Sequence, residues 1–157
     1  MKKIRPTILL PFLFVLVISW GCSGNRNVVP PVFGSSKWVE YETNIYGGNY
    51  SYSKETIEHR TKTVVQVWNR VVYSAEGRER YIQDMKDNGI STDGYENLSE
   101  THRLNEIDCK KGMYNIVSIV DYDRNGKILF SDSYKKSEWN NIRFGSMMDK
   151  LRKKVCK

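Results

Sequence analysis

The sequence predicts an α+β fold, with a roughly six-stranded antiparallel sheet and two helices. Segments dense in β-branched and aromatic residues are separated by turn residues, and 12 % of the chain is aromatic, much of it Tyr. The two helical patterns do not alternate regularly with the strand patterns. Antiparallel pairing is therefore favoured over a parallel α/β sheet.

Six segments carry the main strand signals. We expect strands around residues 38–41 and 50–52, and a long strand within 61–73, where the sequence TKTVVQVWNRVVY is rich in Val and aromatic residues. A further strand is expected over 98–109. A hairpin follows, with strands over 113–122 and 127–134 around the turn signal Asn125-Gly126.

Two segments carry helix signals. The first helix is expected over residues 75–88, with Ser74 as its N-cap and Gly89 as its C-terminal stop. The second is expected at the C-terminus, capped by Ser146, with basic residues that complement the helix dipole at its end. The apolar positions predicted to face the core are Tyr81, Ile82 and Met85 in the first helix, and Met148, Leu151 and Val155 in the second.

Residues 1–21 have the architecture of a secretory signal peptide. Three basic residues precede an apolar run over 8–18, which is shorter than the roughly 20 residues that a membrane span needs. Gly21 precedes Cys22, as in a bacterial lipobox, although Ser19 stands where Leu is usual. We expect cleavage before Cys22 and lipidation of its thiol; the alternative is an ordinary signal peptide followed by a chance cysteine.

The chain after the signal divides into a tether and one domain. Residues 22–36 are polar, contain two prolines and show no period that buries a face, so we expect a lipidated flexible tether. Residues 37–157 are enough for a single domain. Three of the 25 basic residues and no acidic residue lie in the signal, so 22 basic and 18 acidic residues remain and the net charge falls from +7 to +4. This bias is too small to predict a nucleic-acid partner.

Cys109 and Cys156 are an even pair in an exported chain, and we expect them to form a disulfide. The bond would tether the C-terminal helix to one face of the sheet. A zinc site is disfavoured, because there is no C-x-x-C motif and His59 and His102 lie at unrelated spacings.

An ordered set of short motifs resembles the surface-adhesin protein E-like family of Gram-negative lipoproteins, from about Trp38 to Cys156. The motifs are Trp38-Val39-Glu40-Tyr41, Val67-Trp68, Ser74-Ala75-Glu76-Gly77-Arg78, Asp108-Cys109, Tyr122-Asp123-Arg124-Asn125-Gly126-Lys127, Trp139, Ile142, Ser146, Leu151 and Val155-Cys156.

The resemblance implies a six-stranded antiparallel sheet, a disulfide-tethered C-terminal helix and adhesion to host matrix and serum glycoproteins such as laminin and vitronectin. Ser23 after the lipidation site resembles the sorting pattern of outer-membrane lipoproteins. We therefore expect an outer-membrane lipoprotein that acts as an adhesin-like binding module, held to the membrane by its N-terminal lipid. The alternative is a structural or assembly accessory of the cell envelope without a host ligand. Which face of the membrane it occupies, and whether it forms a homodimer, are left open.

The hairpin also matches the opening of a calcium loop, at Asp121, Asp123, Asn125 and Asp132. Its flanks are β-branched and aromatic, whereas an EF-hand needs helices on both sides. A plain hairpin turn is favoured over weak calcium binding, and we assign no metal site.

Catalytic signals are weak. His59 and His102 have no nucleophile at a telling spacing, and neither G-x-S-x-G nor H-E-x-x-H occurs. Both histidines are expected to be surface or half-buried structural residues. We expect neither enzymatic activity nor a cofactor.

Two further groups of residues are candidates for binding. If the disulfide forms, it brings together five basic residues: Lys110, Lys111, Lys153, Lys154 and Lys157. This lysine patch would attract a protein or an acidic glycan, with an affinity that falls as salt rises; a solvated helix end is the plainer interpretation. Trp38, Trp68 and Trp139 are expected in the core, although exposed tryptophans would be binding anchors.

Overall fold

The computed structural model describes residues 37–157. The signal peptide expected over residues 1–21, the lipidation of Cys22 and the tether expected over 22–36 fall on residues outside this description. Within residues 37–157, no helix is long and apolar enough to span a membrane.

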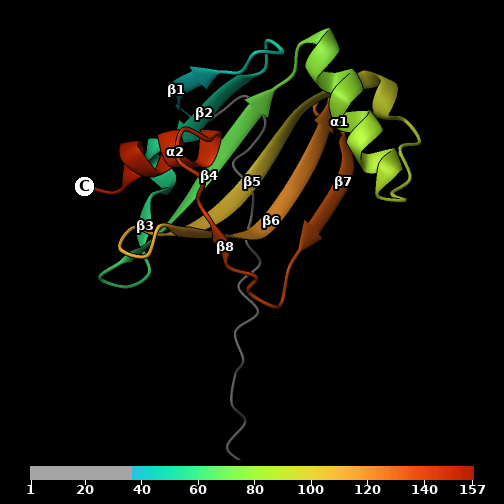
Figure 1. The fold of residues 1–157 in the computed structure, drawn as a ribbon. Coiled ribbons are helices and arrows are strands. Elements are labelled where there is room, and N and C mark those ends of the chain that lie inside the picture. Colours follow the sequence, from blue (N-terminus) through green and yellow to red (C-terminus); the bar gives the residue numbers. More distant parts are fainter. Residues whose placement is uncertain (1–36) are drawn as a thin grey trace, which may run out of the picture.

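In the described chain, eight strands form one antiparallel sheet (Figure 1). Six strands make its main path in the order β1-β2-β4-β5-β6-β7, while β3 pairs with β4 and β8 pairs with β6. The strands are β1 (Trp38–Thr43), β2 (Asn49–Ser53), β3 (Glu58–His59), β4 (Val64–Val72), β5 (Leu98–Asp108), β6 (Met113–Asp123), β7 (Ile128–Ser133) and β8 (Asn140–Asn141).

The helices of residues 37–157 are α1 (Ala75–Asp87) and α2 (Met147–Val155), with 3-10 turns η1 (Lys54–Thr56) and η2 (Tyr95–Asn97). Both predicted N-caps are present. The Ser74 hydroxyl accepts a hydrogen bond from the Gly77 N–H at 3.0 Å, and the Ser146 hydroxyl accepts one from the Asp149 N–H at 3.2 Å. Each cap satisfies a backbone donor that the first helical turn cannot pair.

The predicted α+β class and the six long strands are confirmed. The turn between β6 and β7 contains Gly126 at φ 79°, in the left-handed region that glycine adopts without a steric penalty. The strands that sequence analysis missed, β3 and β8, are two residues long, and two residues cannot display a hydrophobic period.

Both helices lie on the same side of the sheet, which we call the helix-bearing face (Figure 1). Leu151 and Val155 of α2 pack there against Val65, Val67 and Ile107. At the other end of this face, Met85 of α1 packs with the buried residues Tyr95 and Leu98. The opposite face of the sheet has its own buried cluster, made of Trp68, Leu104, Val120 and Tyr122.

The predicted disulfide between Cys109 and Cys156 is confirmed. Its two Cα atoms are 5.6 Å apart, and the cysteines are separated by 47 positions in the sequence. Cys109 directly follows β5 and Cys156 directly follows α2. The bond therefore holds the end of α2 on the helix-bearing face.

The tryptophan prediction is correct for one side chain and wrong for another. Trp68 is buried, with 4 % of its surface exposed, and the half-buried Trp38 packs against the same cluster. Trp139 is exposed at 36 %. The preceding residues 134–138 are exposed and form no strand, so the chain around Trp139 runs at the surface.

The two histidines have different surroundings. His59 is exposed on β3. His102 is completely buried, which corrects the prediction of a surface or half-buried residue. It lies on β5, which is paired on both sides by β4 and β6, and its Nε2 atom is 2.7 Å from Oε1 of Glu100. This carboxylate gives the buried imidazole a polar partner.

Candidate functional site

Two adjoining cavities occupy the helix-bearing face. The larger has a volume of about 660 Å³ and reaches the first turn of α2, while the smaller has a volume of about 490 Å³ and reaches α1. Tyr50 of β2 and Arg103 of β5 line both. We call the combined depression the trough; it runs across the sheet from one helix to the other.

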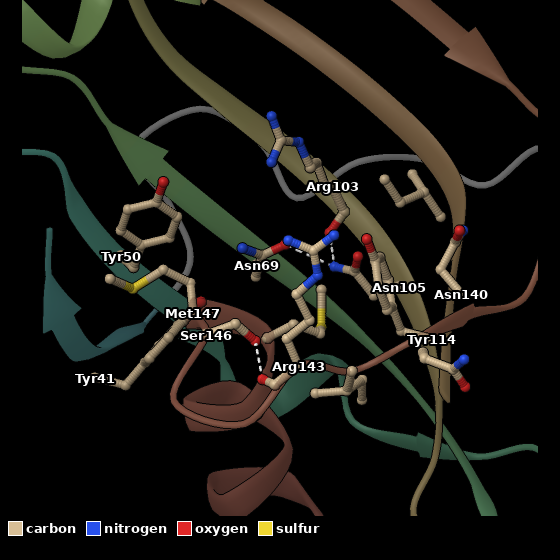
Figure 2. A pocket seen from close by; sticks show the side chains of 14 residues that line it. Tyr41, Tyr50, Asn69, Arg103, Asn105, Tyr114, Asn140, Arg143, Ser146 and Met147 are labelled. Carbon is tan, nitrogen blue, oxygen red and sulfur yellow. Dashed lines mark hydrogen bonds between the residues drawn. The ribbon is translucent and has the colours of Figure 1, made fainter. Parts of the chain in front are cut away.

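Side chains from six strands and from the start of α2 line the larger cavity (Figure 2). Tyr41 and Tyr50 stand toward one side of the view, and Tyr114 and Asn140 toward the other. Of its fourteen lining residues, two are basic, Arg103 and Arg143, and none is acidic. Tyr, Asn, Ser, Met and Ile make up the rest. Tyrosines with adaptable polar side chains and methionines are typical of protein-binding surfaces.

Arg103 is the one cation shared by both cavities. Its Nε atom is buried without a hydrogen-bond partner, and no hydrogen bond or ion pair joins its guanidinium to any residue in 37–157. Figure 2 accordingly shows this guanidinium with no dashed line to a neighbour. Burial alone would lower the pKa of Arg103, but Tyr73, Tyr81, Tyr50 and Asp121 raise it above its usual value. The trough therefore contains a permanent positive charge that no residue of 37–157 pairs.

An asparagine pair fixes the floor beside Arg103. Nδ2 of Asn105 donates to Oδ1 of Asn69 at 2.6 Å and to the backbone oxygen of Arg103 at 3.1 Å. Oδ1 of Asn105 is buried and has no partner among the described residues. These bonds hold the amides of β4 and β5 in place, so this part of the site is formed before any ligand arrives.

Beside the smaller cavity, whose lining includes Tyr81, lies a buried carboxylate held by hydroxyls. Asp121 is completely buried and accepts hydrogen bonds from Thr101 Oγ1 at 2.5 Å, Tyr95 OH at 2.8 Å and Tyr81 OH at 3.2 Å. Burial, and after it the neighbouring charge of Asp121, raise the pKa of Tyr81 to about 12. The phenol therefore stays protonated and remains a hydrogen-bond donor at neutral pH.

The hairpin that resembled a calcium loop is a turn closed by its own hydrogen bonds. Oδ1 of Asp123 accepts from the backbone N–H groups of Asn125 and Lys127, both at 2.8 Å. Asp121 points into the fold, while Asp132 is exposed on β7. Over residues 37–157, no group of three or more His, Cys, Asp or Glu side chains is placed to hold a metal ion.

The five lysines of the predicted patch lie within three positions of a bridged cysteine, and they differ in their surroundings. Lys110 and Lys111 are exposed in the turn after β5. Lys154 and Lys157 line a separate cavity of about 230 Å³ beside His59. Lys153 is paired with Asp149, with 2.8 Å between Nζ and Oδ2. Its charge is therefore partly neutralised, which weakens the patch at that position.

Sequence analysis missed the trough. Its signal in the sequence was a charged residue on the inward-facing side of a strand. Arg103 shares this side of β5 with Thr101, Asn105 and the buried Ile107, because every second residue of a strand faces the same way. Arg in such a position is costly unless it is paired or serves a ligand.

Comparison with known proteins places the chain in a family. Solved structures of protein E from Haemophilus influenzae are similar to this chain. One of them, in a second crystal form, is 13 % identical and covers 82 % of this chain and 93 % of its own, with a TM-score of 0.46. Another structure of protein E is 14 % identical and covers 82 % of this chain and 89 % of its own, with the same TM-score of 0.46. No curated protein matches the chain.

The family model described as surface-adhesin protein E matches residues 38–157, which is the whole described domain apart from its first residue. The resemblance carried by the short motifs is thereby confirmed. The chain belongs to the surface-adhesin protein E family, a family of adhesin-like surface proteins.

Proposed function

We propose that this protein is a lipid-anchored, non-catalytic binding module of the outer membrane that attaches to an extracellular protein. The trough is the observation that carries this proposal. It offers tyrosine, asparagine and methionine side chains around an arginine that no described residue pairs, on a face stiffened by a disulfide and by two capped helices. Pre-organised surfaces of this composition bind macromolecules with a low entropic cost.

Membership of the surface-adhesin protein E family supports attachment outside the cell. The lipobox-like sequence that ends at Cys22 supports an anchor, and 14 residues separate Cys22 from the described domain. A flexible linker of this length has a root-mean-square reach of roughly 20 Å. The domain would then stand close to the membrane.

The lysine patch is a second proposed contact. Lys110, Lys111, Lys154 and Lys157 would attract acidic glycans or phosphates and accelerate encounter with an acidic partner. We expect the protein to be retained on immobilised heparin, with retention that falls as the salt concentration rises. Replacing these lysines and Lys153 by Glu should reduce retention further. Unchanged retention would contradict this contact.

Binding to immobilised matrix and serum glycoproteins tests the proposed function. The full chain, extracted in detergent from membranes, is applied to laminin, vitronectin and a serum albumin control over a range of concentrations. Saturable binding to a glycoprotein, with none to albumin, is expected. If no extracellular protein is bound, and crosslinking in native envelopes instead links the chain to envelope proteins, the accessory function is the better account.

A further inference from the structure

We propose that the trough holds an extended acidic peptide segment of the partner, with a carboxylate of that segment paired to the guanidinium of Arg103. This inference rests on the proposed function, because it assigns the partner's binding element to the site already described. It adds the chemistry of the ligand and the residue that selects it.

The first step is the state of Arg103. Its Nε is buried without a partner, and its guanidinium makes no hydrogen bond or ion pair within residues 37–157. Arg103 is half-buried, and burying its Nε–H donor without a partner is unfavourable; a carboxylate that forms two parallel hydrogen bonds to the guanidinium would satisfy this donor. An arginine held in this way is prepared for an anion that arrives with the ligand.

The second step is the sign of the charge around it. The lining of the larger cavity includes Arg103 and Arg143 and no acidic residue. Arg80 lines the smaller cavity but is already engaged: its guanidinium stacks 3.8 Å above the Tyr46 ring, and its Nε is 3.5 Å from Oε1 of Glu76. Asp84 also lines the smaller cavity, so that end of the trough already carries a negative charge. The electrostatic demand therefore falls on the larger cavity, for one or two negative charges centred on Arg103.

The third step separates a peptide from a polyanionic glycan. Two cations in fourteen lining residues are too few for a heavily sulfated chain, which binds through many Lys and Arg contacts. Ile116, Ile142, Met147 and Met148 provide apolar surface that sugars and sulfates do not use. Apolar side chains flanking a carboxylate are what a peptide supplies.

A selection experiment with a defined probe tests this proposal. A display library of random 12-residue peptides is selected against the detergent-extracted full chain, and each selected peptide is resynthesised with every Asp and Glu replaced by Asn or Gln. We expect the selected peptides to contain at least one carboxylate. Its removal should weaken binding about 10- to 100-fold, the range of a charge-assisted contact.

The variants locate the contact. Arg103→Gln should weaken binding by a similar factor, and Arg103→Lys by less, because Lys keeps the charge and loses the paired geometry. Arg124→Gln, in the exposed β6–β7 turn outside the trough, is the matched control and should bind as the wild type does. If circular dichroism shows that Arg103→Gln does not fold, peptide binding is measured with Arg103→Lys and Tyr50→Ala in its place.

A double-mutant cycle decides whether the two charges meet. The loss of binding free energy when a Glu→Gln peptide is combined with the Arg103→Gln protein should be clearly smaller than the sum of the losses from the two changes made separately. Additive losses overturn the pairing. The proposal is also overturned if Arg103 variants bind the peptides with an affinity within twofold of wild type, or if no peptide is selected. It is overturned as well if heparin oligosaccharides displace the peptides from the wild type and this displacement is lost in the Arg103 variants. None of these results bears on glycoprotein binding by the whole chain, which tests the proposed function separately.

Discussion

Cys109 and Cys156 are bonded across 47 positions of sequence, and their bond joins the turn after β5 to the end of α2. The central strand that leads to Cys109 also carries Arg103 and Asn105 on the floor of the trough. The same bond holds the end of α2, and the start of this helix lines the trough with Ser146 and Met147. A single covalent bond thus connects the stability of the domain to the shape of its candidate site.

Replacing both cysteines, as Cys109→Ser with Cys156→Ser, should lower the free energy of unfolding by about 4 kcal/mol, because the closed loop no longer restricts the denatured chain. Urea denaturation of the variant and the wild type measures this difference. Reduction of the wild type with a thiol is the independent control and should give the same shift. A loss below about 1 kcal/mol would mean that α2 is held by its apolar contacts alone.

Removing a buried side chain from α2 should be costly. Leu151 is completely buried in the cluster with Val67 and Ile107, so Leu151→Ala should lower the free energy of unfolding by about 3 kcal/mol through lost burial and a residual cavity. Phe144→Ala, at a position that is 93 % exposed, is the matched control and should change it by less than about 0.5 kcal/mol. Equal effects of the two substitutions would contradict the packing of α2 on the sheet.

Acid should weaken the start of α2 through Asp149. Its carboxylate accepts hydrogen bonds from Lys153, Arg152 and the backbone N–H of Gly145, and these hold its pKa well below the usual value of 3.8. A lowered pKa in the folded state stabilises the fold above the unfolded pKa, and this stability is lost as pH falls from about 4 through the folded pKa.

Asp149→Asn should therefore lower the melting temperature at pH 7 and remove part of the decline seen in the wild type below pH 4. Thermal melts from pH 2 to 7 provide the comparison. Asp93→Asn, at an exposed position, is the control and should follow the wild-type curve at pH 7. If Asp149→Asn melts like the wild type at pH 7, the contacts of Asp149 do not stabilise the helix.

Much of the fold could be predicted from the sequence because the signals were local. The β-branched run of β4, the serine caps of α1 and α2 and the Asn125-Gly126 turn each depend on neighbours a few residues away. The pairing of Cys109 with Cys156 was also predictable, since in the exported domain two cysteines remained to be paired.

The trough could not be predicted because it depends on distant packing. Tyr50 and Arg103 come from β2 and β5, and they line the same cavities because both strands pair with β4 and both helices cover the same face. The exposure of Trp139 has a similar origin. Its hydrophobicity favoured the core, but the irregular segment before β8 leaves it at the surface.

The anchor has a direct test in Cys22→Ser. The lipobox interpretation predicts that this variant loses palmitate labelling and passes from the membrane fraction to the soluble fraction, because a thiol is needed for diacylation. Cell fractionation with metabolic labelling measures both changes. Ser23→Ala, at the next position, is the matched control for labelling and should keep the lipid. Membrane retention of Cys22→Ser with undiminished labelling would contradict the proposed anchor.

The central claim is that this domain is displayed outside the cell as a binding module. Protease treatment of intact cells, followed by detection of the C-terminal part of the chain, tests it most directly, with a periplasmic protein as the control for intact membranes. The account predicts that the domain is removed from intact cells while the periplasmic control survives. A domain that resists protease until the outer membrane is permeabilised would contradict it and would favour an accessory function inside the envelope.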